Sequence, residues 1–98
     1  MKKKKVPKFL QPYLWSVPVG NLDADRDKVY IIHQILSYGD IAALRWLLET
    51  YHKEVIRRVF ALHPKRIYLP SVFYFVKNFV LGLEHKKLTA RAYVKSLR

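Results

Sequence analysis

The chain has 98 residues, no cysteine, and 19 basic against seven acidic residues, which gives a formal net charge of +12. This length is enough for one domain, and the absence of cysteine excludes disulfides, thiolate zinc sites and thiol nucleophiles. No apolar run is long enough to cross a bilayer or to serve as a secretion signal, so we expect a cytoplasmic protein with no membrane partner.

The charge is distributed unevenly along the sequence. Residues 1–8 carry five lysines, residues 9–62 hold six basic and six acidic residues, and residues 63–98 hold eight basic and one acidic. We therefore expect a flexible basic arm at 1–8, a helical domain at 9–83, and a basic tail or short helix at 84–98. A positive charge of this size favours acidic or polyanionic partners.

The stretch 9–19 combines large apolar side chains with proline. Pro12 and Pro18 make a long helix unfavourable here, because proline removes a backbone donor and clashes with the preceding turn. The large side chains are Phe9, Leu10, Tyr13, Leu14 and Trp15. They predict an extended aromatic strap that lies over the helical core.

A first helix is expected at 25–38, where apolar residues recur at helical spacing. Asp23, Asp25 and Asp27 place negative charge at its start, which suits the positive end of the helix dipole. They lack the glycine and the distal glutamate of a calcium loop, so a role at the helix start is the better interpretation.

A second helix is expected at 41–51. Gly39 should end the preceding helix, because glycine tolerates positive φ, and Asp40 should cap the new one. The residues expected to face inward are Ile41, Leu44, Leu47, Leu48 and Tyr51.

Two further helices are expected at 53–62 and 71–83, followed by a short frayed helix at 89–97. His63-Pro64 ends the first of them, and Pro70 suits the first turn of the next. The helix at 71–83 is apolar nearly all round, so it must be enclosed. Either the strap covers it completely, or part of it is a partner surface. Together these elements predict an all-α fold, a compact bundle of four to five short helices.

No catalytic residue, metal site or cofactor is expected. The histidines show no metal-binding spacing, and His33 and His52 are interpreted as helix-surface or boundary residues. Three scattered glycines exclude a glycine-rich phosphate loop and a GxSxG nucleophile motif. The sequence therefore predicts a binding protein and no enzyme.

Cations on the third helix and after it are candidates for nucleic-acid binding. The residues are Lys53, Arg57, Arg58, Lys65 and Arg66, presented as in a helix-turn-helix protein. The connection near Tyr51-His52 is short for that motif, and Glu54 shares the face. A solvated helix face and an acidic protein partner remain the alternatives, and homo-oligomers are left open.

The sequence also resembles a family of small bacterial and archaeal proteins described only as a domain of unknown function. The matching elements are Leu14-Trp15, Leu22-Asp23, Arg26-Asp27, Ile31-Ile32, Leu36, Tyr38-Gly39-Asp40, Leu44-Arg45-Trp46-Leu47, Tyr51, Val55-Ile56-Arg57 and the segment 71–75. The resemblance spans 9–83. Where the family usually has glycine, this chain has His52, which leaves the break between the second and third helices open.

The resemblance implies an antitoxin-like role, since members are commonly encoded beside nucleotidyltransferase-like toxins of the abortive-infection type. On this interpretation the protein contacts a toxin partner through the strap and the exposed part of the helix at 71–83, and inhibits it sterically. The residues expected at that contact are Tyr13, Trp15, Phe73, Tyr74 and Lys77. The alternative function is a small basic DNA- or RNA-binding protein.

Overall fold

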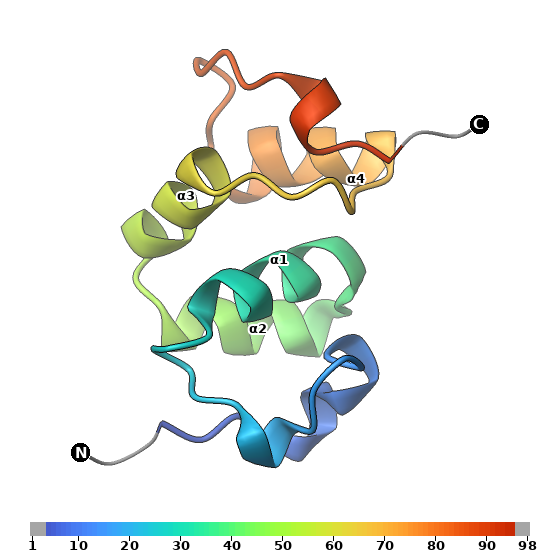
Figure 1. Ribbon diagram of the computed structural model, residues 1–98. Helices are drawn as coiled ribbons and strands as arrows, with labels where there is room; N and C mark the ends of the chain where they lie inside the picture. The colour runs from blue at the N-terminus through green and yellow to red at the C-terminus, as the bar shows by residue number, and fades with distance from the viewer. Residues whose placement is uncertain (1–3, 96–98) are drawn as a thin grey trace.

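The computed structural model describes residues 4–95, and the predicted all-α fold is confirmed (Figure 1). The α-helices are α1 (Lys28–Tyr38), α2 (Ile41–Thr50), α3 (Lys53–Leu62) and α4 (Pro70–Phe75), and a π-turn, η3 (Val76–Val80), continues α4. Short 3-10 turns are η1 (Lys8–Tyr13), η2 (Val19–Asn21) and η4 (Ala90–Ala92). Between residues 4 and 95 there is no strand, and a single parallel bridge joins Tyr68 to Val94.

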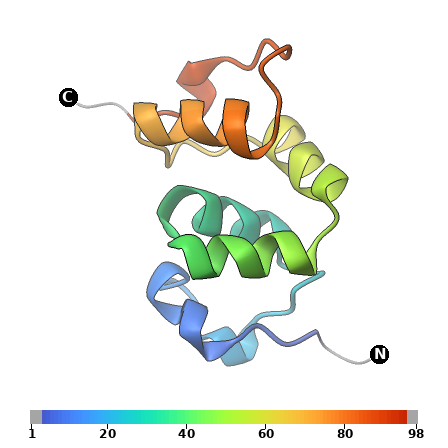
Figure 2. The same cartoon turned by 180° about the vertical axis from the view of Figure 1, so that it is seen from behind.

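The molecule has two lobes that share one core. We call residues 4–52 the amino-terminal lobe and residues 53–95 the carboxy-terminal lobe. In Figures 1 and 2, α1 and α2 lie side by side with η1 and η2 on their far side, and α3, α4 and the last turn form the other lobe. Helix α1 packs against both α2 and α3, and all its residues from 31 to 36 are buried. It is therefore the central element of the fold.

The turn before α1 is built by aspartate side chains. The Asp23 carboxylate accepts hydrogen bonds from the backbone N–H groups of Asp25 and Arg26, at 2.9 and 3.0 Å, and Asp27 accepts from the Asp23 N–H at 2.9 Å. These bonds satisfy backbone donors in a turn that precedes the helix. The expected role at the helix start is supported, although α1 begins at Lys28, three residues later than predicted.

The junction between α1 and α2 was predicted correctly in position but not in mechanism. Asp40 caps α2, with its carboxylate 2.9 Å from the Ala43 backbone nitrogen. Gly39, however, has φ −71°, so the predicted positive φ is wrong. A Cβ at this position would lie 2.7 Å from the Ile35 carbonyl oxygen. Glycine is needed here for space and not for a left-handed backbone.

The inward face of α2 is narrower than predicted. Ala43 and Leu47 are buried, but Ile41 and Leu48 are exposed, so their predicted inward orientation is wrong. Helix α2 packs mainly on α1. One neighbouring helix covers only one side of α2, which leaves part of the apolar stripe outside.

The predicted strap does cover the core, since Leu10 and Leu14 are fully buried, but it winds into η1 instead of running extended. Gln11 holds the segment together. Its side-chain amide donates to the carbonyls of Leu14 and Val17, at 2.8 and 3.1 Å, and accepts from the Val19 N–H at 2.8 Å. A 3-10 turn is short enough to accommodate Pro12 inside it.

The described part of the predicted flexible arm is packed on the fold. The Lys4 carbonyl accepts from the Ala24 N–H at 2.9 Å, the Lys4 N–H donates to Asp23 at 3.1 Å, and the side chain of Val6 is buried. Residues 1–3 lie outside the described residues. From Lys4 onward, the prediction of a flexible arm does not agree with the structure.

The predicted basic tail is also part of the fold as far as it is described. Tyr93 is buried, and its ring stacks on Phe60 and Phe73 at centroid distances of 4.7 and 4.9 Å. Its hydroxyl donates to the Phe60 carbonyl at 2.6 Å. That carbonyl would bond to residue 64 in a continuous helix, but Pro64 has no N–H. Instead of the frayed helix expected at 89–97 there is η4, and residues 96–98 lie outside the described part.

His33 is buried in α1, so its assignment to the helix surface is wrong. One ring nitrogen lies 2.6 Å from the His63 carbonyl and the other 2.7 Å from the Tyr68 hydroxyl. Because a carbonyl can only accept, Nε2 carries the hydrogen and Nδ1 accepts from Tyr68. Burial lowers the pKa of His33 to about 4, against a smaller opposing effect of its bond to His63. The side chain joins the two lobes as a neutral ring.

Candidate binding surfaces

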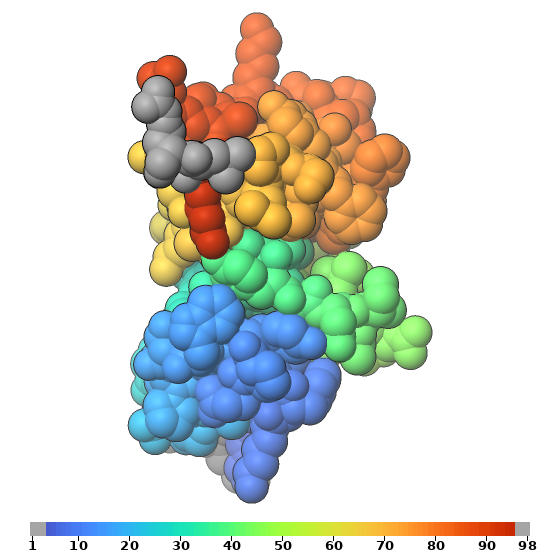
Figure 3. Space-filling model, turned by 90° about the vertical axis from the view of Figure 1, so that its right-hand side faces the viewer, coloured from blue at the N-terminus to red at the C-terminus, as the bar shows by residue number. Residues whose placement is uncertain are grey.

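An apolar groove lies between the start of α2 and the helix formed by α4 and η3. Its volume is about 330 Å³. Figure 3 shows this side of the molecule, with the orange residues of α4 and η3 above the green residues of α2. The side chains in and around the groove that matter here are Ile41, Leu44, Leu48, Val72, Phe75 and Phe79.

The groove is bordered by unusually exposed apolar side chains. Ile41 is 75% exposed and Phe79 is 80% exposed, and Phe75 lies beside Phe79 with 6.1 Å between ring centroids. Soluble monomers rarely leave large apolar side chains together on the surface without a functional reason. Of the two alternatives given by the sequence, complete coverage of the helix at 71–83 by the strap is wrong, because Tyr74, Phe75 and Phe79 are exposed.

The residues predicted to contact a partner protein are only partly available. Phe73 is 0% exposed, and it packs in the aromatic core, so its prediction as a contact residue is wrong. Tyr74 is exposed, and Lys77 is half-buried. The apolar pattern of the helix indicated that one side must face outward, but it did not identify which side. Phe75 and Phe79 were missed for that reason.

Tyr13 and Trp15 lie at the border of the groove. The Trp15 ring packs edge-on against Tyr38, 4.9 Å between centroids, immediately before the groove residues Gly39 and Asp40. Hydrogen bonds from the Ala43 N–H and then from the Tyr13 hydroxyl hold the pKa of Asp40 below its usual value. The strap therefore contacts the segment 38–40, from which Gly39 and Asp40 line the groove.

A second hollow, of about 320 Å³, lies between α3 and the segment after η3. Arg57, Arg58 and Lys86 line it, together with apolar side chains that include Leu83. Arg57 is half-buried and holds its surroundings in place: Nε donates to the Leu81 carbonyl at 2.7 Å and a terminal nitrogen lies 2.7 Å from Glu54. Arg58 remains exposed to solvent.

The structure divides the cations predicted to bind nucleic acid. Lys53 is exposed at the start of α3, and Arg66 is exposed on the connection to α4. Lys65 lies elsewhere, with Nζ 5.9 Å from the centre of the Tyr30 ring on α1. Lys86 belongs to the predicted basic tail, and the folded chain brings it to α3 beside Arg58. The connection between α2 and α3 consists of Tyr51 and His52, both in extended backbone, so the helix does break at this point. A two-residue connection is short for a helix-turn-helix motif.

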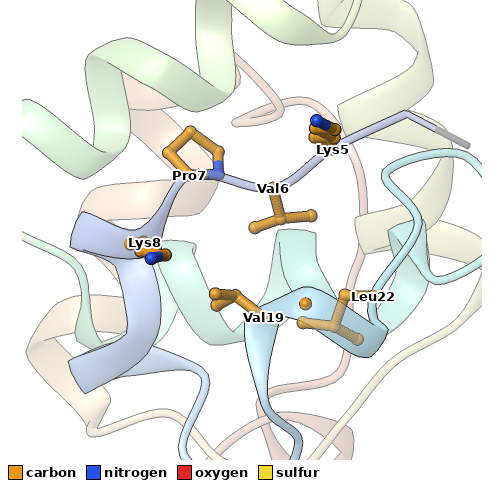
Figure 4. A pocket seen from close by; sticks show the side chains of 7 residues that line it. Lys5, Val6, Pro7, Lys8, Val19 and Leu22 are labelled. Atoms are coloured by element: carbon orange, nitrogen blue, oxygen red, sulfur yellow. The ribbon is translucent and has the colours of Figure 1, made fainter.

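A third hollow, of about 450 Å³, lies between the amino-terminal arm and η2. Figure 4 shows Val6 from the arm facing Val19 and Leu22, with Lys5 and Lys8 on either side of the arm's apolar residues. The lining is chiefly apolar and carries no acid–base pair.

Across residues 4–95, no three histidine or carboxylate side chains gather closely enough to hold a metal ion. None of the helices in that range has both the length and the apolar character required to span a lipid bilayer.

Residues 9–60 match the family of unknown function DUF6922. The chain belongs to this family. Neither a curated protein nor a solved structure matches it. The match covers the amino-terminal lobe from η1 onward and most of α3, so it is shorter than the predicted resemblance, which extended to residue 83. The hollow beside Arg58 and the exposed phenylalanines of the groove draw on residues beyond the match.

Proposed function

We propose that this DUF6922 protein is a non-catalytic binding protein that docks on a partner protein through the groove between α2 and α4. The observation that carries the proposal is a group of exposed apolar side chains: Ile41 and Phe75 line the groove, and the exposed ring of Phe79 lies beside Phe75. Interface centres are typically apolar and rich in aromatic residues, with polar groups at the margin. The groove has this composition, with Asp40 and Tyr13 at its border.

The partner we propose is a nucleotidyltransferase-type toxin encoded beside this protein, so that the role is that of an antitoxin. This follows from the resemblance given above, in which neighbouring genes suggest the pairing. Inhibition would be steric: the apolar border of the groove docks on the toxin, and the bulk of the two lobes covers the toxin's active-site cleft or its nucleotide-binding surface. Such a role requires no chemistry of this chain's own.

Co-expression tests the proposal. The wild-type chain should co-purify with the toxin encoded beside it and restore growth. Ile41→Asp combined with Phe79→Asp should abolish both, because two charges would be buried without partners in the interface. The matched control is Leu62→Asp combined with Leu69→Asp, which places the same two charges on exposed apolar residues that belong neither to the strap nor to the groove lining.

Circular dichroism should show that all these variants remain folded, since each replaced side chain is exposed. Loss of co-purification in the control as well would remove the groove from the proposal. Failure of the wild-type chain to bind the toxin and to restore growth would overturn the antitoxin role itself.

A further inference from the structure

The carboxy-terminal lobe carries a large positive charge that its own carboxylates do not offset. It has ten lysines and arginines against two acidic residues. Glu54 is paired with Arg57 at 2.7 Å, and Glu84 lies 3.5 Å from His85. The nine other cations of the lobe have no carboxylate within ion-pair distance among residues 4–95. The amino-terminal lobe, by contrast, has six basic and five acidic residues.

The hollow between α3 and residues 81–87 gathers part of this charge into a concave site. Arg58 comes from α3 and Lys86 from the segment after η3, and both line the hollow. In Figure 1 that segment, orange to red, leaves α4 close to α3. The hydrogen bond from Arg57 to the Leu81 carbonyl, together with the turn at Gly82 with φ 61°, holds the segment against the helix.

The same arrangement removes the objection that Glu54 would repel an anion. Its carboxylate is paired with Arg57, so Arg57 both anchors the wall of the hollow and offsets the negative charge on it. Arg58 and Lys86 are exposed, line the hollow, and have no carboxylate within ion-pair distance among residues 4–95. A guanidinium group and an ammonium group that face one concavity are a suitable pair for phosphate oxygens.

We propose that this hollow binds a backbone phosphate of a double-stranded nucleic acid. Arg58 and Lys86 contact the phosphate, and Arg57 is a positioning residue. The other unpaired cations of the lobe, including Arg66 and Lys87, interact with neighbouring parts of the backbone. This site is separate from the groove between α2 and α4 and does not depend on the proposed antitoxin role.

The composition of the site favours nucleic acid over an acidic protein. Protein interfaces depend on apolar and aromatic anchors at their centre, whereas nucleic-acid interfaces are more polar and much more positively charged. Around this hollow Leu62 is an exposed apolar residue, but no aromatic residue lines it. The lack of aromatic side chains also argues for a duplex, because binding of single strands typically uses base stacking.

Fluorescence anisotropy with a short labelled DNA duplex, and with the RNA duplex of the same sequence, tests the proposal. Binding by the full-length chain should weaken steeply between about 50 mM and about 200 mM salt, with a log–log slope of about −0.9 for each phosphate contacted on DNA. The Arg58→Glu, Lys86→Glu double variant should bind about tenfold or more weakly and show a shallower slope, because phosphate contacts are lost.

The matched control is Lys28→Glu combined with Arg45→Glu, which changes the net charge equally but in the amino-terminal lobe, where both side chains are exposed. Its affinity should fall much less. Equal weakening of both double variants would mean that net charge alone drives binding, and would overturn the site. Absence of binding to either duplex at low salt would overturn it as well.

Polyglutamate added as a competitor separates nucleic acid from an acidic protein. It should displace the duplex poorly compared with unlabelled duplex of the same charge concentration. If polyglutamate displaced the labelled duplex as effectively as unlabelled duplex does, the proposal of a nucleic-acid site would be overturned in favour of a site for an acidic protein. Preference for DNA or RNA follows from comparing the two labelled duplexes.

Discussion

The two lobes hold their interiors together with different side chains. In the amino-terminal lobe, aliphatic residues such as Leu14, Ile35 and Leu47 are fully or almost fully buried around α1 and α2. In the carboxy-terminal lobe, rings pack on rings, with Tyr93 between Phe60 and Phe73. The aliphatic lobe is made of elements adjacent in sequence. The aromatic lobe closes only when the last described residues return to α3.

The lobes also differ in what they leave on the surface. The amino-terminal lobe has nearly balanced charge, and the carboxy-terminal lobe has ten basic against two acidic residues. The match to DUF6922 ends at residue 60, inside α3. The matched part therefore ends before three of the rings that bury Phe60, which are Tyr68, Phe73 and Tyr93. The matched region alone would leave Phe60 without these partners.

Tyr93→Ala tests whether the last segment belongs to the fold, and it should have the largest effect. Removing a buried ring that packs on two others should lower the free energy of unfolding by about 3–5 kcal/mol. Tyr93→Phe keeps the ring but leaves the Phe60 carbonyl without a donor, and should cost about 1–3 kcal/mol. Urea unfolding measures both. Tyr74→Ala, at an exposed ring of the same lobe, is the control. If Tyr93→Ala lowered the free energy of unfolding no more than Tyr74→Ala does, Tyr93 would not be needed for the fold.

The His33 ring, which bonds to both Tyr68 and His63 across the boundary between lobes, should make stability depend on pH. The folded protein keeps this ring neutral down to a pKa of about 4, whereas the unfolded chain takes up a proton near its ordinary value of 6.5. Stability is therefore fully present above pH 6.5 and decreases as the pH falls toward 4. The total loss should be about 3 kcal/mol.

Urea unfolding at a series of pH values between these limits measures that decrease. Hydrogen bonds lower the pKa values of Asp23 and Asp27, so protonation of these carboxylates reduces the free energy of unfolding only at lower pH. A flat stability between pH 6.5 and 5 would contradict the neutral, buried state of His33.

Gly39→Ala tests the close packing at the α1–α2 junction of the amino-terminal lobe. Its Cβ would lie 2.7 Å from the Ile35 carbonyl and 3.0 Å from Ala43, so backbone would have to shift. Overpacking of this kind should lower the free energy of unfolding by about 1–3 kcal/mol. Gly20→Ala is the matched control, because nothing lies within 4 Å of its added Cβ. Equal, small effects at the two positions would show that the junction has room.

Local signals in the sequence predicted much of the fold. Helix α3 begins and ends at the residues expected, because Pro64 prevents its continuation and its apolar period is regular. The cap at Asp40 was likewise predictable, since a capping side chain bonds within its own turn. The error at Gly39 arose because glycine at a helix end usually adopts a positive φ. Here glycine is needed because a side chain would collide with the Ile35 carbonyl.

Features that depend on distant residues could not be predicted in this way. His33 is buried because Tyr68 and residues 63–64 cover it, and its own neighbours in sequence do not indicate this. Lys86 joins Arg58 only through the turn after η3. Of the predicted partner-binding residues, Phe73 turned inward, because an all-apolar helix does not show which side its neighbours will cover. Helix ends and caps, which depend on local structure, were thus predictable, whereas the burial of a side chain by distant residues was not.

Asp40→Ala should have the smallest effect of the changes considered, because it removes a single cap from α2. Loss of the bond to the Ala43 N–H should reduce the equilibrium constant for folding roughly fivefold. Asp40→Asn retains an oxygen acceptor and should cost less. Both are measured by urea unfolding at neutral pH, with Asp25→Ala as control, since that exposed carboxylate forms a surface ion pair with Lys4 at 3.6 Å. If Asp40→Asn proved as harmful as Asp40→Ala, the negative charge beside Tyr13 would matter more than the capping bond, because asparagine keeps an oxygen acceptor. The border of the groove, and not the helix start, would then explain why an aspartate is needed here.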